Sequence, residues 1–503
     1  MKNSNKNSLP KVETGVPGFD LICLGGIPRG RTTLVSGTAG SAKTVFGAQF
    51  LVGGIEIGEA GVFVTFEETP EDIKANLKSF NWDVEKWEED NKWVFVDGSP
   101  SPEEELNFTG EFDLEALLAR IKHAVKKVDA KRVTLDSLGS IFYHFEDASL
   151  VRHEIYKIAY TLKKMGVTAV LTAERSAEYG DISRFGIEEF VTDNVIVLRN
   201  AMDKEKRRRT VEILKFRGTM HQKGEFPFTI DPSSGIVAIP LSAMKMEQRS
   251  TNIRITSGNK GLDKMCDGGF FRDCVALISG ATGTGKTLIT TEFISGGTET
   301  GDKCMLFAFE ESRDQLLRNA SGWGVDFESM EKEGKLKIIC EYPETSTLEE
   351  HLTLIQDYIK EFQPTRVAVD SLSALERVST TKGFREFVVS LSSFLKEMQI
   401  TGLFTSTTPS LLGGPTITEA HISTITDLII LLRYVEAFGE MKRAITLLKM
   451  RGSTHDKRIR EYNIDGRGMT IGRPFENMSG ILSGVFQPTV PEEIERLDDL
   501  FDE

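Results

Sequence analysis

The feature that most constrains the fold of this chain is an internal repeat. The segment SGTAGSAKT, residues 36–44, returns 243 residues later as SGATGTGKT, residues 279–287. Four further pairs of segments keep the same order, at an offset of 243 and later of 234: GVPGFD with GNKGLD, VFVTFEE with MLFAFEE, VTLDSL with VAVDSL, and EILKFRGT with TLLKMRGS. These ordered matches predict two homologous domains between a flexible N-terminus and a short acidic C-terminal tail, with boundaries at 1–11, 12–245, 246–484 and 485–503.

Within each copy, short apolar runs alternate with amphipathic stretches. RTTLVSG, GVFVTFEE, RVTLD and TAVLTAE have the length and composition of strands, and TVFGAQFLVGGIEIG has helical spacing. Strands that alternate with helices predict an α/β fold, in which a mostly parallel sheet carries helices on both faces. VIVLRNAMDKEKRRRTVEILKFRG adds two strands around a polar turn, which predicts a hairpin at the edge of the sheet.

The second copy contains an unbroken phosphate-binding loop. A strand that ends in a Gly-rich turn and opens a helix points several backbone N–H groups at one place, where phosphate oxygens bind. Lys286 is expected to reach the β- and γ-phosphates, and the Thr287 hydroxyl is expected to bind Mg²⁺. The predicted nucleotide-binding residues of this loop are Gly280, Thr282, Gly283, Thr284, Gly285, Lys286 and Thr287.

The first copy departs from the pattern at one residue, because Ala42 stands where the second Gly belongs. A decayed site, in which the extra methyl group crowds the phosphates, is one interpretation. We favour a working site, since Ala is a good helix former at a helix start and both Lys43 and Thr44 are retained. Its predicted nucleotide-binding residues are Gly37, Thr38, Ala39, Gly40, Ser41, Ala42, Lys43 and Thr44.

Acidic residues follow two apolar strands in each copy. Asp136 and Asp370 end strands, where an acid commonly holds Mg²⁺ through water, although an Asp that caps the next helix is the alternative. The pairs Glu67-Glu68 and Glu310-Glu311 also follow strands, and one member of each pair could act as a general base. The alternative for these pairs is two solvated surface acids.

Cations occur at matching places in both copies. Lys215 and Arg217, and likewise Lys449 and Arg451, alternate along predicted strands, so each pair points to one face. They could reach a phosphate, including that of a neighbouring subunit, or could belong to a solvated strand face. The basic run at 206–209 is predicted to be a solvated hairpin tip, since the second copy is much less basic there.

The copies differ most informatively just before the predicted hairpin. The second copy has Ser423-Thr424 where the first has Glu189-Phe190. A hydroxyl pair at this position is a candidate phosphoacceptor. The alternative is an ordinary Ser and Thr at a strand edge.

Composition narrows the classes of protein. The formal net charge of −14 argues against a protein that coats nucleic acid. No apolar run is long enough for a membrane span, and MKNSNKNSLPKVE lacks the apolar core of a signal peptide, so a cytoplasmic protein is expected. The five Cys form no CxxC pair, which indicates reduced thiols.

Taken together, these motifs resemble the KaiC family, the double-domain ATPases of the cyanobacterial circadian clock. The resemblance covers nearly the whole chain, and its most specific carriers are both loops, both Glu-Glu pairs, EEFVTDN, LKMRGSTHDK and ITEAHISTITD. It implies a RecA-like P-loop fold in each half and a homohexameric double ring with ATP between subunits. It also implies slow ATP hydrolysis in the first ring, and in the second a reversible phosphate transfer to its own Ser and Thr, so that the chain is an ATPase, autokinase and autophosphatase.

The resemblance also assigns residues. It implies phosphorylation of Ser423 and Thr424 with Thr418 nearby, Glu310 as a base that helps bind Mg²⁺ with Glu311 beside it, and Glu67 and Glu68 in hydrolysis. Metal contacts are implied for Thr44, Asp136, Thr287, Glu310 and Asp370. Further ATP contacts, some across the subunit boundary, are implied for Ser79, Lys215, Phe216, Arg217, Thr219, His221, Trp323, Arg443, Lys449, Met450, Arg451, Ser453, His455 and Lys457.

Three features depart from the family pattern. Ala42 is one, and Thr454 stands where the family commonly has Trp, close to the second nucleotide. The third is the tail GVFQPTVPEEIERLDDLFDE, where the clock proteins have a longer segment gripped by KaiA. Its length and acidity argue against dependence on KaiA, whereas a KaiB-like partner on the first domain is still expected. Two rival classes stay open, a RecA-type nucleic-acid motor and a nucleotide-gated scaffold with negligible chemistry.

Overall fold

The chain divides into two compact units, 1–245 and 246–503, each described here by itself. The computed structural model describes residues 9–99, 114–141, 148–183, 186, 188–203, 206–240, 250–408, 422–437, 439–475, 478–479 and 487–488. Within these ranges, none of the helices is both long and apolar enough to cross a membrane.

Each unit is built on one large sheet, which has nine strands within the described ranges. In the first sheet the order is β11 (Gly235–Ala238), β10 (Glu225–Asp231), β9 (Lys206–Phe216), β8 (Asn194–Asp203), β3 (Thr32–Gly37), β7 (Thr168–Glu174), β6 (Arg132–Asp136), β4 (Gly61–Thr65) and β5 (Trp93–Asp97). In the second it is β16 (Leu336–Cys340), β15 (Cys304–Ala308), β17 (Arg366–Asp370), β18 (Thr401–Thr407), β14 (Val275–Gly280), β19 (Leu428–Ala437), β20 (Glu440–Met450), β21 (Arg460–Asp465) and β22 (Gly468–Pro474). Short two-stranded pairs accompany them: β1 (Lys11–Val12) with β2 (Ile27–Pro28), β12 (Arg254–Ile255) with β13 (Phe270–Phe271), and β23 (Met478–Ser479) with β24 (Gln487–Pro488).

Helices connect the parallel strands in the same sequence in both units. Those of the first are α1 (Phe19–Ile22), α2 (Lys43–Glu56), α3 (Pro70–Lys78), α4 (Val84–Glu89), α6 (Leu114–Val128), α7 (Leu138–Ile141), α8 (Ala148–Lys164) and α9 (Glu188–Val191). Those of the second are α10 (Lys260–Met265), α11 (Lys286–Glu299), α12 (Arg313–Gly322), α13 (Phe327–Lys332), α14 (Leu348–Phe362), α15 (Leu372–Arg377) and α16 (Thr381–Glu397), with 3-10 turns η2 (Pro343–Thr345) and η3 (Ile422–Thr424). The predicted α/β fold, a mostly parallel sheet flanked by helices, is confirmed in each unit.

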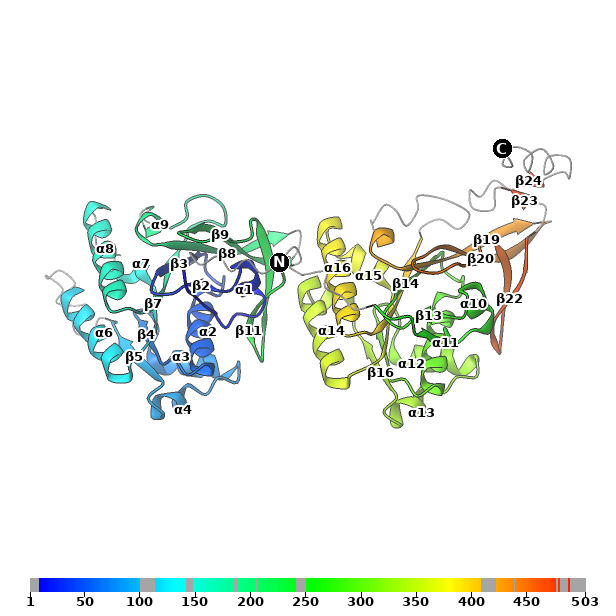
Figure 1. Ribbon diagram of the computed structural model, residues 1–503, viewed down its shortest axis with the longest axis horizontal. Coiled ribbons are helices and arrows are strands. Elements are labelled where there is room, and N and C mark those ends of the chain that lie inside the picture. The colour runs from blue at the N-terminus through cyan, green and yellow to red at the C-terminus, as the bar shows by residue number, and fades with distance from the viewer. Residues whose placement is uncertain are drawn as a thin grey trace. The chain divides into compact units, whose positions relative to one another are not determined.

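The sheets are covered on both faces, as their apolar strands predict. Neighbouring residues of β3 separate onto the two sides: Val35 packs with Phe46 and Phe50 of α2, whereas Leu34 packs with residues of α6 and α8. Figure 1 shows α2 and α3 on one side of the first sheet and α6 and α8 on the other, and the same division in the second unit, with α11 and α12 opposite α14 and α16. The strand period of two therefore supplies both apolar faces from one short sequence.

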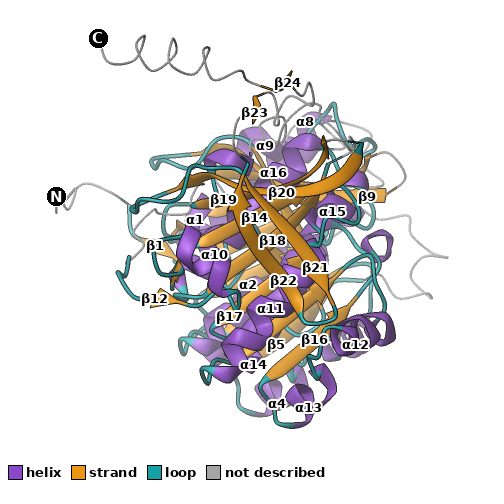
Figure 2. Ribbon diagram, turned by 90° about the vertical axis from the view of Figure 1, so that its right-hand side faces the viewer, coloured by secondary structure: helices purple, strands orange, loops and turns teal. Residues whose placement is uncertain are grey.

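The predicted hairpin forms, but it is not at the edge of the sheet. β8 pairs with β9 in antiparallel register, and β10 and β11 then extend the first sheet beyond β9. The second sheet is extended in the same way by β21 and β22, and Figure 2 shows the β19–β20 hairpin beside β14. Sequence reasoning placed the edge one hairpin too early because EFPFTID and REYNID, which form β10 and β21, were not assigned as strands.

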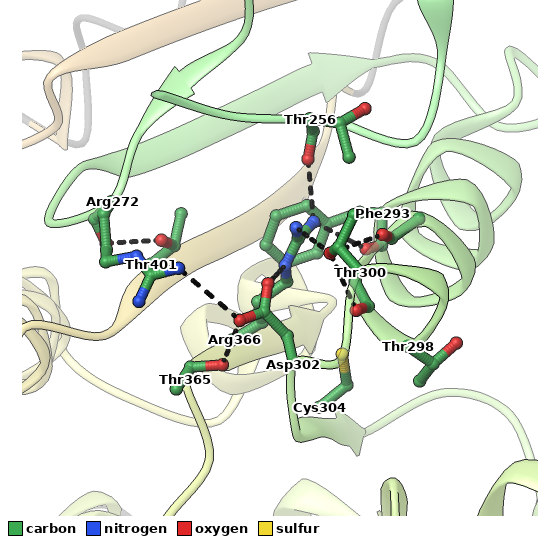
Figure 3. Close-up of polar contacts among 12 residues, drawn as sticks. Thr256, Arg272, Phe293, Thr298, Thr300, Asp302, Cys304, Thr365, Arg366 and Thr401 are labelled. Carbon is green, nitrogen blue, oxygen red and sulfur yellow. Dashed lines mark hydrogen bonds and ion pairs between the residues drawn. The ribbon is translucent and has the colours of Figure 1, made fainter. Parts of the chain in front are cut away.

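At the amino ends of the parallel strands in each unit, one buried arginine joins the helix that follows the phosphate loop to the sheet. Arg366 at the start of β17 is 1% exposed, and its Nε donates to Asp302 Oδ2 at 2.8 Å (Figure 3). Its Nη1 donates to the carbonyl oxygens of Thr256 and Phe293, and the guanidinium lies 5.0 Å from the Phe293 ring centre. Arg132 repeats this arrangement in the first unit with Glu59 and Phe50.

We expect Arg366→Met to lower the free energy of unfolding of the second domain by about 3–5 kcal/mol, the usual cost of removing one partner of a buried ion pair. The substitution leaves the carboxylate of Asp302 without its main partner, although Thr365 still donates to Asp302 Oδ1 at 2.9 Å. Calorimetry of the full chain should show one of two unfolding transitions shifted. Arg272→Met is the matched control, because its guanidinium is 3.7 Å from Asp302 and partly exposed, and its loss should cost below about 1 kcal/mol. Equal shifts for both variants would contradict this role of Arg366.

Candidate nucleotide-binding sites

The parallel strands of each sheet end together and bring the predicted site residues to one edge. Gly37 is in register with Glu174, and Thr65 with Asp136. In the second sheet Gly280 is in register with Thr407, and Ala308 with Asp370. Ligands of open α/β sheets bind outside these carboxyl ends, so the phosphate loops lie where such a ligand is expected.

The second phosphate loop has the geometry that its glycines allow. Gly283 and Gly285 have φ of 80° and 95°, in the left-handed region, and Lys286 opens helix α11. The Lys286 ammonium donates to the carbonyl oxygens of Gly280 and Ala281 at 2.9 and 3.0 Å, and burial lowers its pKa. The loop therefore presents a cation and the free N–H groups of a helix start to one place, which suits phosphate.

The first loop takes the same path, but our reason for tolerating Ala42 was wrong. Ala42 is the N-cap residue of α2 and has φ 72° and ψ 31°, in the left-handed region, so its helix propensity is irrelevant. A residue with a Cβ costs about 1–2 kcal/mol in this region. The methyl group is nevertheless accommodated, because Ala42 packs against the core that contains Phe46.

This difference predicts opposite effects of the reciprocal substitutions. Ala42→Gly should stabilise the first domain by up to about 1 kcal/mol, since the relief of strain exceeds the added chain entropy. Gly285→Ala should destabilise the second by about 2 kcal/mol, because it adds that strain and its Cβ would lie 2.7 Å from Ile464 Cδ1. Urea unfolding of the two full-length variants measures both. A destabilised Ala42→Gly protein would show that the methyl contact outweighs the backbone strain.

A hydroxyl and a carboxylate meet behind each loop. Thr44 Oγ1 donates to Asp136 Oδ2 at 2.7 Å, and Thr287 Oγ1 donates to Asp370 Oδ2 at 2.9 Å. Burial raises the pKa of both aspartates. In the described ranges, no three His, Cys, Asp or Glu side chains are grouped so as to hold a metal ion by themselves. That donor set, one hydroxyl with a nearby acid, fits Mg²⁺ carried by a nucleotide.

The two members of each Glu pair point to different partners. Ser137 Oγ donates to Glu67 Oε1 at 3.2 Å and Ser371 Oγ to Glu310 Oε2 at 2.8 Å, and both serines directly follow the strand-ending aspartates. Glu68 and Glu311 instead accept bonds from Asn76 and Asn319, on helices α3 and α12, and burial raises the pKa of each. The geometry favours Glu67 and Glu310 as the members that face a bound phosphate.

Sequence reasoning missed Arg377 at these sites and assigned Arg209 to a solvated hairpin tip. Arg377 Nη2 lies 2.6 Å from Glu310 Oε1, so the candidate base of the second domain is ion-paired. Arg443 and Arg209 occupy equivalent strand positions, paired with Tyr434 and Asn200 beside the phosphate loops. The buried Nε atoms of Arg443 and Arg209 have no hydrogen-bond partner in the described parts of the chain. A bound anion beside the phosphate loop would supply one. The 234-residue offset from Arg443 to Arg209 was the signal for the latter.

The remaining cations lie at the opposite edge of the sheets. Lys215 Nζ donates to the carbonyl oxygens of Glu189 and Thr192, and Lys449 Nζ to that of Thr426, all near the amino ends of β3 and β14. Burial lowers the pKa of both lysines. Because β14 has six residues, about 20 Å separates this edge from the phosphate loop of the same domain.

The candidate phosphoacceptors share the amino edge of the second sheet. Ser423 and Thr424 belong to η3, and Arg451 Nη2 donates to the carbonyl oxygen of Thr424 at 2.7 Å. Thr424 is exposed. Thr418 lies outside the described residues.

The other predicted contacts fall in two groups. Ser79 and Trp323 are the C-cap residues of α3 and α12. The rest end or directly follow β9 and β20, at the edge away from the loop of the same chain: Phe216, Arg217, Thr219, His221, Met450, Ser453, His455 and Lys457. Thr454 Oγ1 donates to Asp267 Oδ2 at 3.2 Å.

Comparisons with known proteins agree with this geometry. A protein-family model for the KaiC ATPase matches the chain twice, at residues 12–243 and 255–476. The chain is 62% identical to the circadian clock protein KaiC3 of Synechocystis sp. over 503 residues, which cover 100% of both chains. It is 54% identical to the circadian clock oscillator protein KaiC of Thermostichus vulcanus over 475 residues, which are 94% of this chain and 91% of the relative. The corresponding protein of Synechococcus elongatus is 52% identical over 483 residues, covering 96% and 93%.

Proposed function

This chain belongs to the KaiC family of ATPases, and from that premise we propose that it is a clock-type timing protein with two different nucleotide chemistries. The first domain, 12–245, hydrolyses ATP. The second, 246–484, transfers the γ-phosphate of ATP to Ser423 and Thr424 and reverses that transfer, so that the phosphorylation state is the output.

The observation that carries this proposal is the separation of the phosphoacceptors from the phosphate loop of their own domain. Ser423 and Thr424 lie at the amino edge of the second sheet, and Lys286 and Thr287 lie at the carboxyl edge. Phosphoryl transfer requires the reacting atoms to approach within about 3–3.5 Å. A donor loop from a second copy of the chain is therefore needed, which supports a homohexameric ring with ATP at each subunit boundary.

Such a ring also gives the amino-edge cations a role. Lys215 and Arg217, and Lys449 and Arg451, would contact the phosphates bound to the neighbouring copy. One heterologous interface repeated six times closes each ring. Cations at this position stabilise the charge that develops on a transferring phosphoryl group.

Within the second site, Glu310 is the proposed general base for the Ser or Thr hydroxyl, and Arg377 restrains its carboxylate. Thr287 and Asp370 would hold the Mg²⁺ that neutralises phosphate charge, with Glu310 near it. In the first site Glu67 would polarise the attacking water, and Thr44 and Asp136 would hold the metal. Glu68 and Glu311, tied to asparagines, position their neighbours.

Partners follow from the family. A KaiB-like protein is the proposed partner of the first domain. Dependence on KaiA is not proposed, on the basis of the acidic tail at 485–503, which lies outside the described residues except for 487–488. The net charge of −14 speaks against the nucleic-acid motor, and the serine-bonded Glu67 and Glu310 speak against a scaffold without chemistry.

The test is to incubate the purified full chain alone with γ-labelled ATP and Mg²⁺ and to map the label by peptide mass spectrometry. We expect label on Ser423 and Thr424, and loss of that label after addition of excess ADP. A mixture of two inactive variants, Lys286→Met and Ser423→Ala/Thr424→Ala, should recover label on the Lys286→Met chains, because the donor loop comes from the other copy. Hydrolysis without any label, even with KaiA added, would refute the autokinase.

A further inference from the structure

Two carboxylates flank the phosphate loop of the first domain, one at the end of β7 and one four residues later. Glu174 ends β7 and is in register with Gly37, the first residue of the loop. Glu178 Oε1 accepts a bond from Thr38 Oγ1 at 2.6 Å, and its Oε2 accepts one from the backbone N–H of Asn200 at 2.9 Å. A phosphate loop attracts anions, so acids placed beside it oppose its ligand.

The segment that carries Glu178 is held in place by buried cations. Arg175 is 7% exposed, and it donates to the carbonyl oxygens of Gly180 and Asp181. Arg199 is 6% exposed, and its Nε donates to the carbonyl oxygen of Glu178 at 3.2 Å. The carboxylate therefore sits on the loop as part of a fixed structure.

The second domain has no counterpart of these acids in the sequence that follows β18. Thr407 takes the register position of Glu174, and its backbone N–H donates to Ser373 Oγ at 2.7 Å. From Thr407 the sequence runs to Glu419 without an acidic residue. The two loops thus differ in charge although their backbones match.

The surroundings of the two loop lysines show the same difference in charge. Burial lowers the pKa of both, and carboxylates oppose that shift. At Lys43 the opposing acids are Glu174, Asp136, Glu67 and Glu178, whereas at Lys286 they are Asp370 and Glu310.

We propose that Glu174 and Glu178 determine the specificity of the first site for hydrolysis with rapid release of phosphate, while the second loop, without them, tolerates the phosphoryl group that returns from Ser423 or Thr424 to ADP. The inference rests on the proposed function of the two domains. Hydrolysis breaks the bond between the β,γ-bridging oxygen and the γ-phosphorus, water supplies the new oxygen, and its proton passes to Glu67. Inorganic phosphate, with a charge between −1 and −2, then leaves a loop that two fixed carboxylates disfavour for it.

Neutralising either carboxylate should therefore make the first site hold phosphate more tightly. At an effective dielectric constant of about 20, one carboxylate within about 10 Å of phosphate changes its affinity by at least about tenfold. The measurement uses the full chain with Glu310→Gln, which silences transfer in the second domain, and inorganic phosphate as a product inhibitor of ATP hydrolysis. Glu174→Gln and Glu178→Gln should each lower the inhibition constant of phosphate about tenfold.

Two controls separate charge from structure. Glu178→Asp retains the charge and should restore weak inhibition by phosphate. Glu56→Gln removes one charge from the same domain at the far end of α2, about 20 Å from the loop, and should change nothing. Tighter inhibition by phosphate in Glu56→Gln, or the same inhibition constant in all variants, would overturn the proposal.

A second readout does not depend on turnover. Inorganic phosphate added with MgADP should raise the unfolding temperature of the first domain more in Glu178→Gln than in the parent chain, because at a given concentration a ligand that binds more tightly stabilises the folded state more. If the Glu310→Gln protein hydrolysed no ATP, the proposed function of the first domain would fail. This thermal experiment would still test the role of the two acids. If phosphate raised the unfolding temperature of all variants equally, the proposed role of Glu174 and Glu178 would be refuted.

Discussion

Replacing Glu310 with Gln is expected to slow the labelling of Ser423 and Thr424 from ATP by roughly 10²–10⁴-fold, the usual loss when a general base is removed. Gln has nearly the same shape and can still accept the bond from Ser371, which lies 2.8 Å from Glu310 Oε2. It cannot take a proton from the acceptor hydroxyl. Quantifying labelled peptides over time in the full chain measures the effect directly.

The matched control is Glu311→Gln, one residue away. Glu311 accepts its bond from Asn319 on helix α12, so its loss should change the labelling rate by less than about tenfold. Glu67→Gln should stop hydrolysis in the first domain and leave label on the second. Labelling at the parental rate in Glu310→Gln, or a larger loss in Glu311→Gln, would show that the base has been misassigned.

Arg377 forms an ion pair with the proposed base, Glu310. Its side chain is 62% exposed, and an exposed ion pair with Glu310 contributes about 0–1 kcal/mol. The pair can therefore open when a hydroxyl approaches. The position of Arg377 could not be predicted from the repeat, because the offset of 234 places Tyr143 opposite it.

The fold was largely predictable because the chain contains the same pattern of strands and helices twice. The apolar runs that became β3, β4, β6 and β7 were assigned from composition, and the repeat confirmed that the same pattern recurs. The extension by β10 and β11 was missed, since EFPFTID contains Pro227 and few β-branched residues, although Pro227 pairs with Thr210 of β9. Propensity alone carries little information about a strand whose pairing overrides it.

The arrangement of the candidate site could be predicted where its residues are close in sequence, but not where strand register brings them together. The loop from Gly37 to Thr44 is contiguous, so its contact with Asp136 follows from a strand order common to such folds. The division of each Glu pair depends on which side chain meets Ser137 or Asn76, and that requires coordinates. Ala42 is the instructive failure, because its cost comes from a φ of 72° and not from helix propensity.

That residue bears on whether the first loop works at all, and Lys43→Met is the decisive substitution. We expect it to reduce ATP hydrolysis by the first domain by about 10²–10⁴-fold. The substitution removes the charge-assisted hydrogen bonds from Lys43 to the phosphates, and each such bond contributes about 1.5–3 kcal/mol. The Lys43 ammonium already lies at the loop, where it donates to the Thr38 carbonyl oxygen at 2.9 Å. The measurement is phosphate release by the full chain carrying Glu310→Gln.

The outcome separates a working loop from a decayed one. Met has a similar length and apolar stem, so the fold of the first domain should persist, which circular dichroism checks. Ala42→Gly in the same background is the control for the loop backbone, and it should leave hydrolysis within a few-fold of the parent. If Lys43→Met hydrolysed ATP as fast as the parent, the turnover would come from elsewhere and Ala42 would mark a lost site. A large loss would instead mean that the left-handed conformation of Ala42 lowers the stability of the first domain but does not abolish ATP hydrolysis. The charge and the metal contact come from the side chains of Lys43 and Thr44, which the strain at Ala42 does not move.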